Sequence, residues 1–159
     1  MTRAVLSLGS NLGDRRRHLS DAVRALGAQV QAVSAVYRTP PWGPVAQDDY
    51  YNLVLIASSP ELDAYGWLGR CHDLERAAGR VRDIRWGPRT LDADVVVVDG
   101  VESVDPDLVL PHPRAHERAF VLLPWAELEP DAVLPGHGPI ADLLDGLDVT
   151  DIVIVGHVD

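Results

Sequence analysis

Two aspartates at the start of a valine-rich segment are the residues whose type and spacing point most directly to chemistry. They are Asp92 and Asp94, and they stand before the run Val95–Val98 in the stretch RWGPRTLDADVVVVDG, residues 85–100. Because side chains alternate across a strand, the two carboxylates should share one face with Val96 and Val98, about 7 Å apart, while Ala93, Val95 and Val97 should lie on the opposite face. Like charges at that spacing repel each other unless a cation lies between them. The pair therefore predicts a positive group nearby.

Two kinds of positive group could fill that place. Arg89 precedes the pair and could form a local ion pair, which would be a purely structural role. The alternative is a divalent cation such as Mg²⁺, which takes one or two protein carboxylates together with substrate phosphate oxygens and water. Because a D-x-D spacing is common by coincidence, the spacing alone leaves both possibilities open.

Arginines concentrate just before this pair in an otherwise acidic chain. The net charge is −10, and all fourteen basic residues are arginine. Guanidinium groups bind phosphate or carboxylate oxygens bidentately, so a cluster of them indicates a specific anion. Beside a magnesium-binding carboxylate pair, the cluster favours phosphoryl transfer, in which catalysis is mostly positioning and charge neutralisation. The clustered residues are Arg80, Arg82, Arg85 and Arg89.

Other catalytic motifs are missing from the sequence. It has no G-x-S-x-G elbow, no paired metal-type cysteines and no lysine-containing phosphate loop. The Gly-rich stretch GSNLGD at residues 9–14 is therefore interpreted as a turn between a strand and a helix. His112 and His116 have a spacing that zinc ligands can show, but Pro113 lies between them and no third soft ligand is near, which argues against zinc.

Composition limits the class of protein and its partners. The strong negative charge disfavours broad attraction to nucleic acid or to an anionic membrane surface. No apolar run approaches the ~20 residues that span a bilayer, and the N-terminus lacks the apolar segment of a signal peptide. We expect a cytoplasmic protein that forms a single domain over residues 1–159. The single cysteine, Cys71, fits a reducing compartment and is interpreted as a small core residue.

The elements that must position these residues follow from hydrophobic periodicity and turn signals. Residues 39–49, TPPWGPVAQDD, should form a stiff projecting loop because of their prolines and glycine. Asp99-Gly100 is a strong hairpin signal. Ser59 and Pro60 suit the start of the second helix, whose inward side chains should be Leu62, Tyr65, Leu68 and Cys71. Strands are expected at 3–11, 30–38, 50–58, 92–98, 101–104 and 151–158, and helices near 19–26, 60–79, 116–127 and 140–147.

This order of elements predicts an α+β protein. Strand, helix, strand, strand, helix and strand form the double split-βαβ pattern of a ferredoxin-like sandwich, an antiparallel sheet with helices packed on it, here with an added hairpin. The second face of the sheet must then be covered or used. The hairpin, the Pro-rich loop and the C-terminal helices are available for that purpose.

Six segments, taken in order, resemble the 6-hydroxymethyl-7,8-dihydropterin pyrophosphokinase family. The similarity extends over most of the chain, to about Leu123, and RWGPRTLDxD is its most specific motif. Members of that family transfer the pyrophosphoryl group of ATP to a reduced pterin on the route to folate, with two Mg²⁺ ions and a ferredoxin-like fold. The segments are GSNLGD at 9, YRTPPWGP at 37, DYYN at 49, GRVR at 79, RWGPRTLDADV at 85 and LPHPRAHERAF at 110.

The resemblance implies roles for named residues on the nucleotide side. It assigns Asp92 and Asp94 to the two Mg²⁺ ions, and Arg80 and Arg89 to the transfer step together with those aspartates. His72 stands where the family commonly has glutamine, and Pro113 where an aromatic residue can occur. The implied ATP-binding residues are His72, Glu75, Arg82, Trp86, Arg89, Val95, His112 and Arg118, and Arg80 is implied to hold the triphosphate with them.

The resemblance also implies a pterin site. Tyr50 and Phe120 match the aromatic pair that sandwiches the ring, and Asn52 matches the amide that reads its polar edge. Offset stacking contributes about 0.5–1.5 kcal/mol beyond burial of area, so each ring matters for pterin affinity. Two loops that close over the ligands are implied as well. The pterin-binding residues would be Thr39, Pro40, Pro41, Trp42, Tyr50, Asn52, Trp86 and Phe120.

Two rival functions are weighed against this one. A Mg²⁺-dependent nucleotide hydrolase would keep the metal site without a pterin. A ferredoxin-like binding module without catalysis, such as an RNA reader, would carry aromatic residues on its central strands and a basic surface. The strands here are aliphatic apart from Tyr37, Tyr50 and Tyr51, and the charge is negative. With no amphipathic face left over, we expect a monomer whose partners are the small molecules ATP and hydroxymethyl-dihydropterin.

Overall fold

The strand β1 (Thr2–Ser10) lies inside the sheet and pairs antiparallel with β4 (Tyr50–Ser59) on one side and with β5 (Asp92–Val98) on the other. A computed structural model describes residues 2–41, 44, 46–79 and 90–158. Next to β4 lies β3 (Val36–Thr39), and the C-terminal strand β10 (Val153–Gly156) pairs with β3 at the edge. The strand order is β10-β3-β4-β1-β5, and β2 (Val30–Val33) also pairs with β4.

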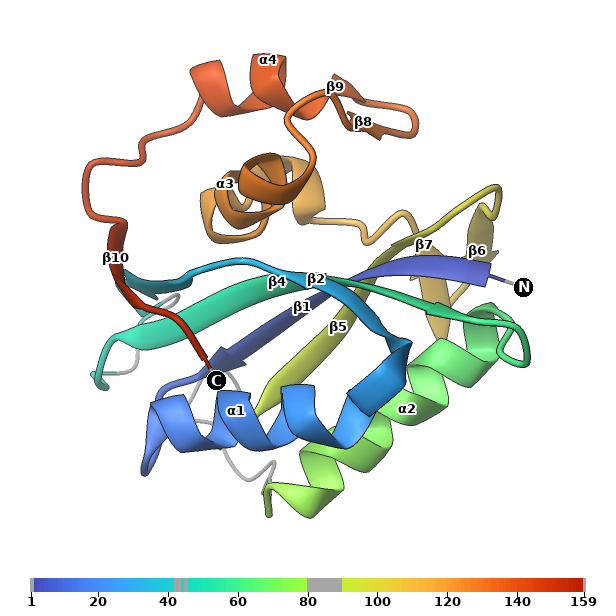
Figure 1. Cartoon of the computed structure of the whole chain (residues 1–159). Helices are drawn as coiled ribbons and strands as arrows, with labels where there is room; N and C mark the ends of the chain where they lie inside the picture. The colour runs from blue at the N-terminus through green and yellow to red at the C-terminus, as the bar shows by residue number, and fades with distance from the viewer. Residues whose placement is uncertain (1, 42–43, 45, 80–89, 159) are drawn as a thin grey trace.

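Helices cover both faces of this sheet (Figure 1). On one face α1 (Arg15–Leu26) and α2 (Ala64–Ala77) bury Leu19, Trp67 and Cys71 against the even-numbered residues of β1. This arrangement confirms the predicted ferredoxin-like sandwich. The other face is covered by α3 (Ala119–Leu128) and α4 (Ile140–Asp145). C-terminal helices were predicted to be available to cover this second face.

The smaller elements connect these layers. The tight turn at Asp99-Gly100 is confirmed, because the Val101 N–H donates to the Val98 carbonyl at 3.0 Å and Gly100 has φ 73°. We expected the strand after this turn to pair with β5. It pairs instead with the next strand along the chain, and the two form a separate two-stranded sheet. These elements are η1 (Gly27–Gln29), β6 (Ser103–Asp105), β7 (Leu108–Leu110), η2 (Ala115–Glu117), β8 (Val133–Leu134) and β9 (Gly138–Pro139).

The second helix begins later than expected. β4 continues through Ser59, and the helix is capped by Asp63, whose carboxylate accepts the Gly66 N–H at 2.8 Å. The inward face of the helix also differs from the predicted one, because Tyr65 is exposed, Leu62 lies before the helix and Trp67 is fully buried. Cys71 is buried as predicted, and burial raises the pKa of its thiol, so it is a core residue.

The predicted strand at 30–38 is interrupted at Ser34 and Ala35. Between β2 and β3 the Ser34 hydroxyl takes the place of a ladder partner, because it accepts the Val54 N–H at 3.0 Å and donates to the Ala35 carbonyl. A side-chain oxygen that competes with the backbone in this way ends regular pairing locally. Among the described residues, no helix is long and apolar enough to cross a membrane.

Candidate active site

The sheet face beneath α3 is apolar at one end and polar at the other. Its apolar end holds Val5, Val54 and Val96, which are buried under α3 and α4. Two residues further along each strand the same face carries small or polar side chains, and the register places Gly9 between Asn52 on β4 and Asp92 on β5. The alternation of each strand therefore brings together groups from three strands where α3 no longer covers the sheet.

A β-bulge separates the aspartates from the rest of the valine strand. Val5 pairs with Val97 but Leu6 pairs with Val95, so Val96 is an extra residue on β5. Asp92, Asp94 and Val96 share one face as predicted. The expectation that Val98 also lies on that face and Val97 opposite is wrong, because after the bulge Val97 packs beneath α3 and Val98 packs on the side of α1 and α2.

A first cavity opens over the polar end of the face. It is bounded by the loop after β3, by β4 and by the start of α3, which are distant in sequence. Most residues predicted to bind the pterin line it, together with both aspartates. Its lining residues are Ser7, Gly9, Thr39, Pro40, Tyr50, Asn52, Asp92, Asp94, Arg118 and Phe120.

The Asn52 amide is held in one orientation at the floor of the first cavity. Its Nδ2 donates to Thr39 Oγ1 at 2.6 Å, and both side chains are buried. Its Oδ1 lies over Gly9, where a Cβ atom would stand only 2.5 Å away. Glycine at position 9 is therefore required by the close approach of this amide.

A second cavity of about 420 Å³ adjoins the first on the outer side of β5. Its walls come from α2, from β5 and from the turn between β6 and β7. All predicted ATP-binding residues that the structure describes line it. Its lining residues are Leu68, His72, Glu75, Asp92, Ala93, Asp94, Val95, Pro106, Asp107, Leu108, Val109, His112, Pro113 and Arg118.

Three charged residues, Asp92, Asp94 and Arg118, line both cavities and so mark their junction. The Arg118 Nη1 lies 3.8 Å from Asp94 Oδ2, and its side chain is only 16% exposed. Its Nε is buried and has no hydrogen-bond partner among the described residues. A buried guanidinium with a donor to spare is suited to an anionic ligand oxygen.

His112 lines the second cavity, within reach of the charges of Asp92 and Arg118, and is a neutral hydrogen-bond donor. Its pKa falls to about 4, because burial disfavours the charged ring and Arg118 repels it, while Asp92 offsets part of that effect. Its Nδ1 accepts the Arg114 N–H at 3.2 Å, so in the neutral ring the proton is on Nε2. The imidazole can thus donate one hydrogen bond from Nε2 to a ligand at neutral pH.

Glu75 supports the backbone between the aspartates. It is 5% exposed, and its Oε2 accepts the Ala93 N–H at 3.1 Å. β5 is an edge strand of the sheet, so among the described residues that N–H has no strand partner on its outer side. The carboxylate on α2 therefore fixes the strand segment that carries Asp92 and Asp94.

The start of the first helix anchors the loop that leads into β4. The predicted turn between strand and helix occupies residues 11–14 of GSNLGD, with Asp14 as the N-cap, while Gly9 and Ser10 still belong to β1. Asn11 is buried and donates to Gln47 Oε1 at 2.6 Å and to the Asp48 carbonyl at 3.0 Å. Arg15 donates to the Asp49 carbonyl at 2.8 Å, and its guanidinium lies 4.0 Å from the Tyr51 ring centroid.

Some predicted residues do not reach the two cavities or are outside the described chain. Pro41 is not among the residues that line either cavity. Sequence reasoning missed Ser7 and Gly9, although their alternation with Leu6 and Leu8 could have placed them on this face. It also missed the turn at Pro106, although the sequence Asp105-Pro106-Asp107 is typical of a turn. The predictions for Trp42, Arg80, Arg82, Trp86 and Arg89 lie outside the described residues.

Comparison with known proteins assigns the chain to a family. The family model of 7,8-dihydro-6-hydroxymethylpterin-pyrophosphokinase (HPPK) matches residues 5–130. The chain belongs to the HPPK family. A protein of Methylorubrum extorquens named 2-amino-4-hydroxy-6-hydroxymethyldihydropteridine pyrophosphokinase is 47% identical over 156 residues, which cover 96% of this chain and 98% of that protein. A Mycobacterium tuberculosis protein of the same name is 45% identical over 163 residues, covering 95% and 87%.

Solved structures of HPPK domains share the fold. The crystal structure of wild-type Plasmodium falciparum HPPK-DHPS superposes with a TM-score of 0.67 at 13% identity. The match covers 91% of this chain and 44% of that one, so this chain spans less than half of the solved chain. At this identity the likeness shows the ferredoxin-like fold of an HPPK domain.

Proposed function

We propose that this chain transfers the pyrophosphoryl group of ATP to the hydroxymethyl oxygen of 6-hydroxymethyl-7,8-dihydropterin, giving AMP and the dihydropterin diphosphate in folate biosynthesis. One observation carries the proposal: two adjoining cavities share Asp92, Asp94 and Arg118 at their junction. A transfer reaction needs its two substrates to meet at the groups that neutralise charge. The junction supplies such groups, and family membership supplies the reaction.

The second cavity would hold ATP with its polyphosphate directed to the junction. Arg118, with its buried Nε, would bind phosphate oxygens, and the neutral His112 would donate from Nε2 to another. His72 and Val95 line the second cavity and not the first, so they would contact the nucleotide rather than the pterin. Arg80, Arg82 and Arg89, which the sequence assigns to the triphosphate, would complete the cation set.

Asp92 and Asp94 would hold two Mg²⁺ ions together with phosphate oxygens of ATP. Their carboxylates fit, since hard cations prefer oxygen ligands and magnesium commonly takes one or two carboxylates plus substrate phosphates. When bound, the ions would make the β-phosphorus more electrophilic and offset charge on the departing AMP. The protein's own contribution is to hold both carboxylates on one face, which β5 and the Glu75 contact to Ala93 achieve.

The first cavity would bind the pterin. Tyr50 and Phe120 supply aromatic surface, and the buried Asn52 amide, oriented by Thr39, supplies a fixed polar group for the edge of the ring. Because the cavity also contains Asp92 and Asp94, a pterin seated there would direct its hydroxymethyl group toward the metal-bound phosphates. Pro40 at the rim would help to exclude water, which competes for the activated phosphate.

We further propose that the chain acts as a monomer of one pyrophosphokinase domain in the cytoplasm, with ATP and the pterin as partners rather than nucleic acid or membrane. The net charge of −10 supports the exclusion of polyanionic partners. The packing of α3 and α4 on the sheet that α1 and α2 cover from the other side supports a single domain.

The test is to incubate the protein with ATP, Mg²⁺ and 6-hydroxymethyl-7,8-dihydropterin and to measure AMP. AMP that forms only when the pterin is present supports the proposed transfer. Hydrolysis of ATP at the same rate with and without the pterin would instead identify a hydrolase. If neither product forms while both ligands bind, the chain is a binding module and the proposed reaction is wrong.

A further inference from the structure

Glu127, near the C-terminal end of α3, accepts hydrogen bonds from β3 and from the residue before it. Its two carboxylate oxygens accept the Ala35 N–H at 3.1 and 3.2 Å, and its Oε1 also accepts the Tyr37 hydroxyl at 2.6 Å. Ala35 and Tyr37 are both buried. One side chain therefore joins the helix over the sheet to a strand of the sheet.

The contact to Ala35 has a structural cause. At Ser34 and Ala35 the chain leaves the β-ladder between β2 and β3, so the Ala35 N–H needs a partner other than a strand. A buried donor without a partner is costly, and Glu127 removes that cost. This contact alone would make Glu127 a residue of the fold.

The contact to Tyr37 connects Glu127 to residues that line the first cavity. Tyr37 and Thr39 are alternate residues of β3 and so share one face. Tyr37 pairs with Asn52 in the ladder, and Thr39 accepts the hydrogen bond of the Asn52 amide. Burial raises the pKa of the Tyr37 phenol, and the hydrogen bond to Glu127 raises it further, so the hydroxyl stays a donor at all physiological pH values.

The other end of the same helix forms the opposite wall of the cavity. Phe120 lies in the first turn of α3 and lines the first cavity, as do Thr39 and Asn52. A helix that is tied to β3 at one end and carries Phe120 at the other fixes the separation of these two walls. Of the contacts described between α3 and β3, those of Glu127 are the charge-assisted ones, which are the stronger kind of hydrogen bond.

We propose that Glu127 is a positioning residue that sets the separation between α3 and β3, and thereby the fit of the first cavity to the pterin ring. The identity of the ligand, a pterin, rests on the proposed function, whereas the contacts of Glu127 are independent of it. It predicts a role in pterin binding for a residue that does not line either cavity.

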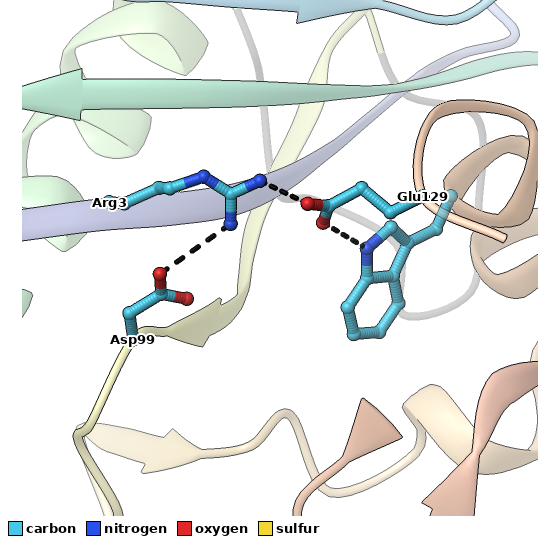
Figure 2. Close-up of polar contacts among 4 residues, drawn as sticks. Arg3, Asp99 and Glu129 are labelled. Atoms are coloured by element: carbon cyan, nitrogen blue, oxygen red, sulfur yellow. Dashed lines mark hydrogen bonds and ion pairs between the residues drawn. The ribbon is translucent and has the colours of Figure 1, made fainter. Parts of the chain in front are cut away.

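Glu129 provides a matched control on the same helix end. It follows Glu127 by two residues, forms an ion pair with Arg3 of β1 and accepts the Trp125 Nε1–H at 3.0 Å, while Arg3 also lies 3.5 Å from Asp99 (Figure 2). Like Glu127 it ties α3 to the sheet through a carboxylate. Its contacts are at the opposite end of β1 from Gly9, so they do not lead to the first cavity.

The experiment compares Glu127→Ala and Glu127→Gln with Glu129→Ala by initial-rate kinetics. Glu127→Ala should raise the KM for the pterin about tenfold, as expected for loss of one or two well-placed hydrogen bonds, with the KM for ATP unchanged. Glu127→Gln keeps an oxygen acceptor for Tyr37 and should recover part of this loss. Glu129→Ala should leave both KM values unchanged.

A second readout requires no catalysis. The NMR resonances of the Asn52 side-chain amide should shift in Glu127→Ala and stay in place in Glu129→Ala. If the Glu127 variants do not fold, Tyr37→Phe, which removes one bond only, should show the same shift and a smaller rise in pterin KM.

The results separate this inference from the proposed function. If the wild-type protein forms no pterin-dependent AMP, the proposed function is wrong, and the amide resonances alone decide on Glu127. If Glu127→Ala and Glu129→Ala change both KM values by the same factor, or if the Asn52 amide is unmoved in the Glu127 and Tyr37 variants, Glu127 only stabilises the fold and the inference fails.

Discussion

Replacing Gly9 by alanine puts a methyl group where the Asn52 amide lies. The new Cβ would stand 2.5 Å from Asn52 Oδ1 and 3.4 Å from Tyr50 Cδ1, and ordinary contact begins near 3.4 Å. The amide must therefore retreat by about 0.9 Å. Its hydrogen bond to Thr39 is 2.6 Å long, so a retreat of that size stretches it to the limit at which a hydrogen bond is lost.

The magnitude follows from the groups involved. Leaving the buried Asn52 donor without its partner costs about 1–3 kcal/mol. Alanine is intrinsically better than glycine inside a strand by about 0.5–1 kcal/mol, so the net loss of unfolding free energy should be about 1–2 kcal/mol. Because the displaced amide lies on the floor of the first cavity, we also expect the KM for the pterin to rise about tenfold. Gly9 does not line the second cavity, so the KM for ATP should be unchanged.

Chemical denaturation and initial rates of AMP formation measure these two effects. Gly69→Ala is the control, since this exposed glycine of α2 has nothing within 4 Å of an added Cβ and alanine should stabilise the helix. Asn52→Ala in the Gly9→Ala background removes the clash, so the two stability losses should be less than additive. A Gly9→Ala protein as stable as the wild type, with an unchanged KM for the pterin, would show that the amide does not depend on the space above Gly9.

Two further predictions concern the junction of the cavities and the second cavity beside it. Asp92→Asn or Asp94→Asn should lower the rate of AMP formation by about 10²–10³-fold while circular dichroism stays that of the wild type, and a near-normal rate in either variant would contradict the metal assignment. The pKa of His112 is depressed to about 4 in the folded protein, so as the pH falls the unfolded state takes up a proton before the folded state does. The unfolding free energy, measured in metal-free buffer, should therefore decrease between about pH 6.5 and pH 4. The full shift corresponds to about 3 kcal/mol and its partial exposure reduces this to about 1–2 kcal/mol, which denaturation curves should show and His112→Gln should abolish.

The sequence predicted those parts of the fold that depend on the pattern of residues within a single element. The first strand, the end of the first helix at Leu26 and the Asp99-Gly100 turn each depend on residues within one element, and all three are present. The pairing of Asp92 with Asp94 on one face was predictable for the same reason, because only one residue separates them. Local pattern could not show the bulge at Val96, since a bulge arises from the fit of one strand to its neighbour.

The parts that sequence missed depend on contacts between distant elements. Trp67 of α2 is fully buried, and its Nε1 donates to Thr2 Oγ1 of β1 at 2.8 Å, so its position depends on a partner that is distant in sequence. Ser59-Pro60 is an equally good local start signal, but β4 continues to pair with β1 as far as Ser59. Sheet pairing thus overrode a helix signal of ordinary strength.

Glu127 shows how such a contact could still have been suspected. It is a charged residue in the apolar segment FVLLPWAEL, residues 120–128, and a carboxylate near a buried helix end needs partners that only another element can provide. The break at Ser34 and Ala35 creates the matching need, a buried N–H without a strand partner. Taken alone, the charged residue would be an unfavourable group in the helix, and the break would be an irregularity of the strand. Together they couple the helix that carries Phe120 to the strand that carries Thr39, so the two irregularities position both walls of the proposed pterin cavity.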